Sequence, residues 1–230
     1  RGKTMTEHAT AVLAALRKAP EFKDVTEVDS ITRLGGLTNL VHRVDVGGTS
    51  VVVRLPGEGT EAYIDRGVEL HNAKAAARAG VSPQGVYGEA DTGLMISTTV
   101  PGIETMSPDL FKTRKGSPTR AGLALAKLHG SGEVFQFRFE LFAMIDEYLK
   151  VLSTRDVQLP DGYHDIVASP APAQQVLVHA DTPLAPFPCD PLHENFLDAG
   201  TVLWIVHWQY SLMNDHLCVF GAVSFTARLV

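Results

Sequence analysis

The stretch PCDPLHENFL, residues 188–197, is followed at residues 201–208 by TVLWIVHW. It places Asp190 and Asn195 five residues apart, ahead of a short turn and an apolar run. This spacing before a buried strand is typical of the catalytic loop of phosphoryl-transfer enzymes. In such a loop the Asp accepts a proton from the substrate hydroxyl, and the Asn offers an amide oxygen to Mg²⁺. A second metal-binding Asp is expected where the strand ends, and this chain has His207 there.

The elements predicted around this loop indicate an α+β chain. Before residue 100 the pattern predicts a first helix and then mainly strands with one inserted helix, and after residue 100 it predicts amphipathic helices. We therefore expect a bilobal protein-kinase-like fold, with a β-rich nucleotide-binding lobe at 1–100 and a helical lobe at 101–230 that carries the catalytic loop. The predicted strands are 26–33, 40–46, 50–55, 84–89 and 94–100, and the predicted helices are 6–19, 65–79, 119–129 and 139–152, with a loop and a short helix at 156–173.

A glycine-containing turn is predicted between the first two strands, at residues 34–39. Gly35 and Gly36 allow backbone N–H groups to approach an anion closely, and Thr38 and Asn39 follow them. The turn is a candidate for covering nucleotide phosphates, although the same residues also suit an ordinary hairpin.

Arg54 lies within an apolar predicted strand, where a charge needs a partner. Glu69, on the following predicted helix, is the candidate partner. A strand cation paired with a helix glutamate holds the α- and β-phosphates of the nucleotide in kinases. The alternative is an exposed arginine on the solvent face of the sheet.

Met95 and Ser97 lie on the last predicted strand of the first lobe, where a kinase hinge would contact adenine. A simple core strand explains the same residues equally well.

Composition narrows the classes of function. A chain of 230 residues with 45% apolar residues can bury a large core. Its net charge of -6 argues against a nucleic-acid partner bound through general electrostatics. Two cysteines are too few for a disulfide scaffold, which favours a cytoplasmic location. Because no apolar run approaches the roughly 18 residues that a bilayer requires, we expect no membrane span.

Taken in order, these residues resemble the choline/ethanolamine kinase family, within the wider aminoglycoside-phosphotransferase-like group. Residues 205–211, IVHWQYS, are similar to the family's I-V-D-W-E-Y-S segment. The resemblance covers nearly the whole chain. Its other stretches are GGLTN at 35–39, VVVRLPG at 51–57, Glu69 with Asn72-Ala73, Pro101-Gly102, LHGSG at 128–132, CDP at 189–191, ENFL at 194–197 and Asn214-Asp215.

The resemblance implies phosphorylation of a small amino alcohol, chiefly choline or ethanolamine, with ATP and Mg²⁺. It also implies that the chain stops before the C-terminal helices of the family. The resemblance implies that Asp190 is the catalytic base and that Asn195 and the position of His207 are metal ligands. It implies that Arg54, with its partner Glu69, binds the nucleotide. The other implied nucleotide-binding residues are Gly35, Gly36, Thr38, Asn39, Met95 and Ser97, and the implied substrate-binding residues are Trp208, Gln209 and Tyr210.

The chain departs from the family pattern near this site, at Pro188, His207, Gln209 and Val219. The last three each replace an acidic residue of the family. An alternative function is therefore a kinase-like protein that binds nucleotide or amino alcohol without efficient turnover. Zinc is a further alternative, although the spacings match no zinc signature. Its candidate ligands are Cys189, His193, His207, His216 and Cys218.

Overall fold

The computed structural model describes residues 2–35, 39–57, 59, 64–155, 157–169, 171–172, 175 and 183–228. Helices and antiparallel sheets make up this α+β fold, as expected. The helices are α1 (Gly2–Leu16), α2 (Arg66–Arg78), α3 (Pro108–Thr113), α4 (Ser117–His129), α5 (Leu141–Ser153), α6 (Tyr163–Ala168) and α8 (His216–Thr226), with 3-10 turns η1 (Pro20–Phe22) and η2 (His193–Asn195). The strands are β1 (Ser30–Gly35), β2 (Asn39–Val46), β3 (Thr49–Pro56), β4 (Gly85–Gly88), β5 (Met95–Thr98), β6 (Glu104–Thr105), β7 (Leu184–Phe187), β8 (Phe196–Asp198), β9 (Leu203–Ile205) and β10 (Leu212–Asp215).

The first five strands form one antiparallel sheet in the order β1-β2-β3-β5-β4. Gly47 and Gly48 join β2 to β3 with φ angles of 55° and 78°, which only glycine adopts without strain. Side chains alternate across a strand, so Val53 and Arg54 of β3 point to opposite faces. Val53 packs beneath α1, and Arg54 points to the face that α2 covers.

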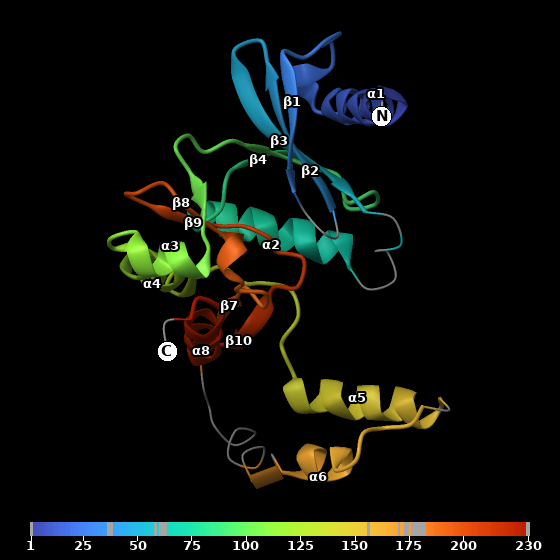
Figure 1. Ribbon diagram of the computed structural model, residues 1–230, viewed down its shortest axis with the longest axis vertical. Coiled ribbons are helices and arrows are strands. Elements are labelled where there is room, and N and C mark those ends of the chain that lie inside the picture. The colour runs from blue at the N-terminus through green and yellow to red at the C-terminus, as the bar shows by residue number, and fades with distance from the viewer. Residues whose placement is uncertain are drawn as a thin grey trace.

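Two apolar clusters hold the described structure together. One lies between α1 and the sheet and includes Leu16, Val44 and Val53. The other joins the alanine face of α2 to α4, α8 and the strands β7 to β9. Figure 1 shows α2 between the five-stranded sheet and the elements that surround α4 and α8. Helix α2 precedes residue 100 but packs in the second cluster, with elements that follow residue 100. The predicted boundary between two lobes at residue 100 therefore stays a prediction.

Helix α2 has clear sequence signals at both ends. The Asp65 carboxylate accepts a hydrogen bond from the Val68 amide at 3.0 Å, which caps the first turn. Gly80, with φ 71°, ends the helix in the left-handed region. These two signals fix where Glu69 lies along the helix, and hence its position opposite β3.

Helices α5 and α6 lie in the second half of the chain. α5 and α6 confirm the predicted long helix and the short helix inside the Pro-rich segment. They lie together at one end of the molecule, away from the sheet (Figure 1). Within the described residues, no helix combines the length and apolar character needed to cross a membrane.

Candidate active site

A buried ion-pair cluster joins the sheet to α2. Arg54 pairs with the Glu69 carboxylate through both terminal nitrogens, one at 2.9 Å from Oε2. Arg66, at the first position of α2, donates to the same Oε2 at 2.9 Å. The exposed fractions of these side chains are 14% for Arg54, 7% for Arg66 and 1% for Glu69. Arg54 is therefore partnered and largely buried, and the solvent-face alternative is wrong.

The ionisation of Glu69 follows from these partners. Burial by itself would raise the pKa of its carboxyl group. Hydrogen bonds and positive charge from Arg54 and then Arg66 outweigh burial and hold the pKa below its ordinary value. Glu69 therefore stays anionic near neutral pH and orients both guanidinium groups.

The glycine turn is described at its two ends only. Gly35 closes β1 with φ 129°, and Asn39 opens β2; Gly36 and Thr38 lie outside the described residues. Asn39 is buried, and its side chain accepts from Arg66 at 3.3 Å and donates to Gln209 Oε1 at 3.0 Å. The structure thus connects Asn39 to the helix and to the segment beyond β9.

The loop between β7 and β8 carries Asp190 and Asn195. The Asn195 side-chain amide donates to the Asp190 backbone carbonyl at 2.7 Å, and Asn195 itself is buried. The Val206 amide donates to the Asn195 carbonyl at 3.0 Å, so the loop is also fastened to the end of β9. Because its amide nitrogen is used in this way, Asn195 keeps Oδ1 available, and no donor to that oxygen is found in the described part of the chain.

His207 follows β9 in a left-handed backbone conformation with φ 75°. Its Nδ1 lies 3.3 Å from Asp190 Oδ2, with exposed fractions of 27% for His207 and 28% for Asp190. The Tyr210 ring packs edge-on against the imidazole at a centroid distance of 6.3 Å. The structure therefore brings Asp190, Asn195, His207 and Tyr210 close together.

These donors suit Mg²⁺ only in part. Asn195 offers a neutral oxygen, whereas His207 offers a nitrogen without negative charge, and Mg²⁺ prefers oxygen ligands. Over the described residues, no group of three or more His, Cys, Asp and Glu side chains is arranged to hold a metal ion. The side chains of His216 and Cys218, from the zinc alternative, lie outside the described set.

Trp208 and Gln209 are buried, unlike the neighbouring Tyr210. The Trp208 indole is 4% exposed, donates to Ser82 Oγ at 3.0 Å and belongs to the second apolar cluster. Gln209 is 5% exposed and holds Asn39. Tyr210, at 38% exposed, is the most accessible of these three side chains.

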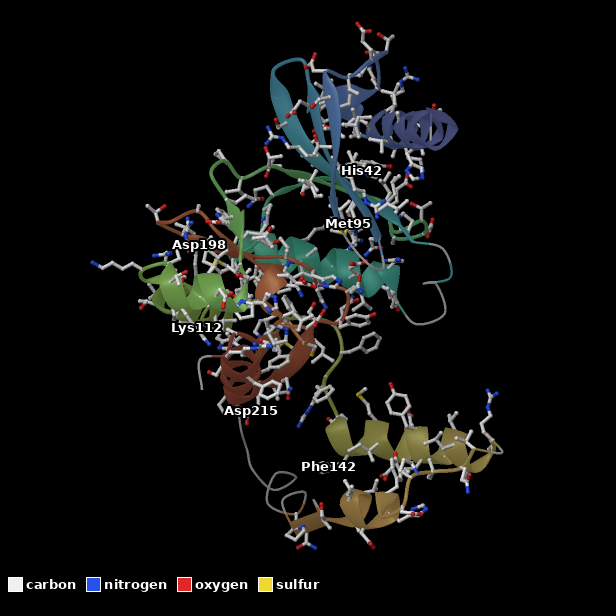
Figure 2. All side chains as sticks on the ribbon, in the orientation of Figure 1. His42, Met95, Lys112, Phe142, Asp198 and Asp215 are labelled. Atoms are coloured by element: carbon white, nitrogen blue, oxygen red, sulfur yellow. The ribbon has the colours of Figure 1, made fainter. Side chains whose placement is uncertain are left out.

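Met95 and Ser97 lie on the same face of β5, by the alternation of side chains along a strand. Figure 2 places Met95 between the sheet and α2, and its side chain packs against the second apolar cluster. The adenine role of both residues remains a prediction.

Sequence reasoning missed two supports of the site. Asp198 lies at the end of β8 (Figure 2). It is fully buried and paired with Arg120 of α4 at 2.6 Å and with Arg114 at 2.9 Å. Asn72 of α2 donates to the Ser211 carbonyl at 2.7 Å. Local patterns indicated neither contact, because Asn72 lies among other polar residues of α2 and Asp198 lies where β8 ends. Both fasten the segment from η2 to β10 against helices.

Several solved structures are similar to this chain. A choline/ethanolamine kinase family protein from Mesorhizobium loti is 49% identical, with a TM-score of 0.84, over 98% of this chain and 72% of that chain. Choline kinase LicA from Streptococcus pneumoniae is 21% identical, with a TM-score of 0.73, over 91% of this chain and 74% of that chain. One LicA structure was solved with AMP. The aminoglycoside 2'-phosphotransferase-IIIa shares the fold at a TM-score of 0.62, which confirms the protein-kinase-like fold.

Curated sequences agree with the structural neighbours. Protein LicA from Haemophilus influenzae is 25% identical over 196 residues, or 85% of this chain. The chain spans 58% of the length of that relative. No protein-family model matches the chain.

Proposed function

Because the chain belongs to the choline/ethanolamine kinase family, we propose that it transfers the terminal phosphoryl group of ATP to the hydroxyl of a small amino alcohol, choline or ethanolamine. The observation that carries this proposal is the hydrogen bond from the Asn195 side chain to the Asp190 backbone. It fixes the loop so that the Asp190 carboxylate stays partly exposed, at 28%, where a substrate hydroxyl can reach it.

In the proposed reaction, Asp190 accepts the proton of the substrate hydroxyl. The hydroxyl oxygen then bonds to the γ-phosphorus, and the bond from that phosphorus to the ADP oxygen breaks. Arg54, oriented by Glu69, binds the phosphates of the nucleotide. The accessible ring of Tyr210 offers a π-face to the cationic amine of the acceptor.

Mg²⁺ is the ion proposed to accompany ATP, and when bound it neutralises charge on the phosphates. Asn195 is the residue of this chain that fits such an ion, through its available amide oxygen. His207 does not fit it, because an imidazole nitrogen carries no negative charge and is a softer ligand than a carboxylate oxygen. The reaction above therefore depends on Asp190 and Arg54 from this chain.

A turnover assay tests the proposal. The chain is incubated with ATP, Mg²⁺ and a panel of choline, ethanolamine and an aminoglycoside, and phosphorylated product is measured by ³¹P NMR. Asp190→Asn is the matched control, because it keeps the shape of the side chain and removes the base; we expect it to lose about 100-fold or more in rate. Absence of product from every acceptor would contradict the proposal.

The contact between His207 and Asp190 favours a second candidate function, nucleotide binding without efficient turnover. His207 Nδ1 lies 3.3 Å from Asp190 Oδ2, where it competes with a substrate hydroxyl for the carboxylate that has to accept the proton. This candidate predicts that ATP binds with nearly the same affinity in Mg²⁺ and in EDTA. Titration calorimetry under both conditions separates the two functions, because a strong Mg²⁺ dependence counts against the second.

A further inference from the structure

We propose that Arg66 is a positioning residue for nucleotide binding, which fixes the Arg54–Glu69 pair and Asn39 in one arrangement. This inference rests on the proposed function for its ligand, an adenine nucleotide with its phosphates. The contacts of Arg66 that support it lie within this chain and involve no nucleotide.

Arg66 is placed where it can act on Glu69 directly. As the first residue of α2 it lies three positions before Glu69, and the two side chains meet at 2.9 Å. Glu69 Oε2 then receives Arg66 Nη1 and Arg54 Nη2, both at 2.9 Å. With two fixed donors on one oxygen, the carboxylate has little freedom to rotate, and the Arg54 guanidinium is held with it.

The other end of the Arg66 guanidinium reaches Asn39, the first residue of β2. Its Nη2 donates to Asn39 Oδ1 at 3.3 Å, and Asn39 Nδ2 donates to Gln209 Oε1 at 3.0 Å. All three side chains are buried. A continuous hydrogen-bonded path therefore runs from Glu69 through Arg66 and Asn39 to the segment that contains His207 and Tyr210.

The turn between β4 and β5 is shaped around the Arg66 stem. At Gly93, an added Cβ would lie 2.7 Å from Arg66 Cδ and 2.8 Å from its Nε. The Gly93 carbonyl also accepts from Arg54 at 3.2 Å. With φ 75°, Gly93 both adopts the left-handed conformation and leaves the space that Arg66 fills. This packing is an independent sign that the chain accommodates Arg66 specifically.

Its buried position separates Arg66 from the other arginine of the same helix. Arg78 pairs with Glu133 on the surface, with a side chain 57% exposed. Its partner Glu133 is not one of the residues of the site, and an ion pair this exposed is screened by water. Arg78→Met is therefore the matched control for Arg66→Met.

The first measurement is ADP affinity by titration calorimetry, with Arg66→Lys as the conservative variant. We expect Arg66→Met to weaken ADP binding by about tenfold or more, on the scale of a lost charged hydrogen bond. Arg66→Lys should restore part of the affinity, and Arg78→Met should leave it unchanged. Equal affinity in Arg66→Met and the unaltered chain, with both folded, overturns the positioning role. If the unaltered chain itself binds no ADP, the proposed function falls and the positioning role falls with it.

The second measurement needs no nucleotide and tests the path itself. Unfolding midpoints are compared for Arg66→Lys, Gln209→Ala and the double variant. Because Arg66 and Gln209 are joined through Asn39, we expect the drop in unfolding midpoint of the double variant to be clearly smaller than the sum of the drops of the two single variants. Additive losses overturn the path. The lysine variant keeps a cation beside Glu69, which guards against a chain that simply fails to fold.

Discussion

Replacing His207 with Asp adds the carboxylate that the family pattern has at this position, and we expect the variant to be much more active. The backbone should accept the change, because Asp, Asn and His are the non-glycine residues most often found with positive φ, and His207 has φ 75°. The perturbation is therefore mainly one of charge, at a point 3.3 Å from Asp190 in the unaltered chain.

The size of the effect depends on whether a cation is bound. Two carboxylates about 4 Å apart repel by about 4 kcal/mol at an effective dielectric of 20. Because more than a quarter of each side chain at this contact is exposed, solvent reduces that to about 1–2 kcal/mol. Without Mg²⁺, the variant should thus unfold at a lower temperature than the unaltered chain. With Mg²⁺ and ATP, the same charges attract the ion, and we expect kcat/KM to rise about 100-fold or more.

The assay measures kcat/KM for ATP over a Mg²⁺ series, together with unfolding midpoints with and without the ion. His207→Asn is the matched control, because it suits the same backbone conformation and carries no charge. Equal activity and equal Mg²⁺ response in the Asp and Asn variants, both folded, would refute the assignment of His207 to the metal position.

Three further predictions concern the supports of the site. Glu69→Gln should weaken ATP binding about tenfold in calorimetry, because a neutral amide orients Arg54 less firmly. Trp208→Phe should lower the free energy of unfolding by about 1–3 kcal/mol in urea and leave KM for the acceptor unchanged, because the indole is a core side chain bonded to Ser82. Burial would raise the pKa of Asp198, but Arg120, the Gly200 amide and Arg114 lower it below its ordinary value. The stabilisation by the Asp198 carboxylate is therefore complete above the ordinary pKa of about 3.9 and is lost as pH falls through the lower pKa of the folded state. In Asp198→Asn, the free energy of unfolding should depend less on pH in that range.

Much of the first half of the fold follows from local sequence signals. The hairpin at Gly47-Gly48 and the helix between Asp65 and Gly80 were predictable because turn and cap residues act within a few positions. The short strands β7 and β10 were not, since their pairing joins segments far apart in the chain and four residues carry little periodicity.

The site divides in the same way. The spacing from Asp190 to Asn195 predicted that both residues belong to one loop before a strand, but it did not predict that the Asn195 side chain donates to the Asp190 carbonyl. Arg66 was missed, because its burial depends on Asn39 and Gly93, which no local pattern connects to it. Trp208 was assigned to the substrate from the family resemblance, and no local pattern indicated that its indole packs in the second apolar cluster and bonds to Ser82.

Helix α2 is anchored on more than one side. Its alanines lie in the second apolar cluster, Asn72 holds the Ser211 carbonyl at 2.7 Å, and Glu69 holds β3. In protein kinases, the corresponding helix is positioned by regulatory signals that switch the enzyme on. A helix anchored at this many points has little freedom to swing, so we expect constitutive rather than switched behaviour, with output set by the supply of nucleotide and acceptor.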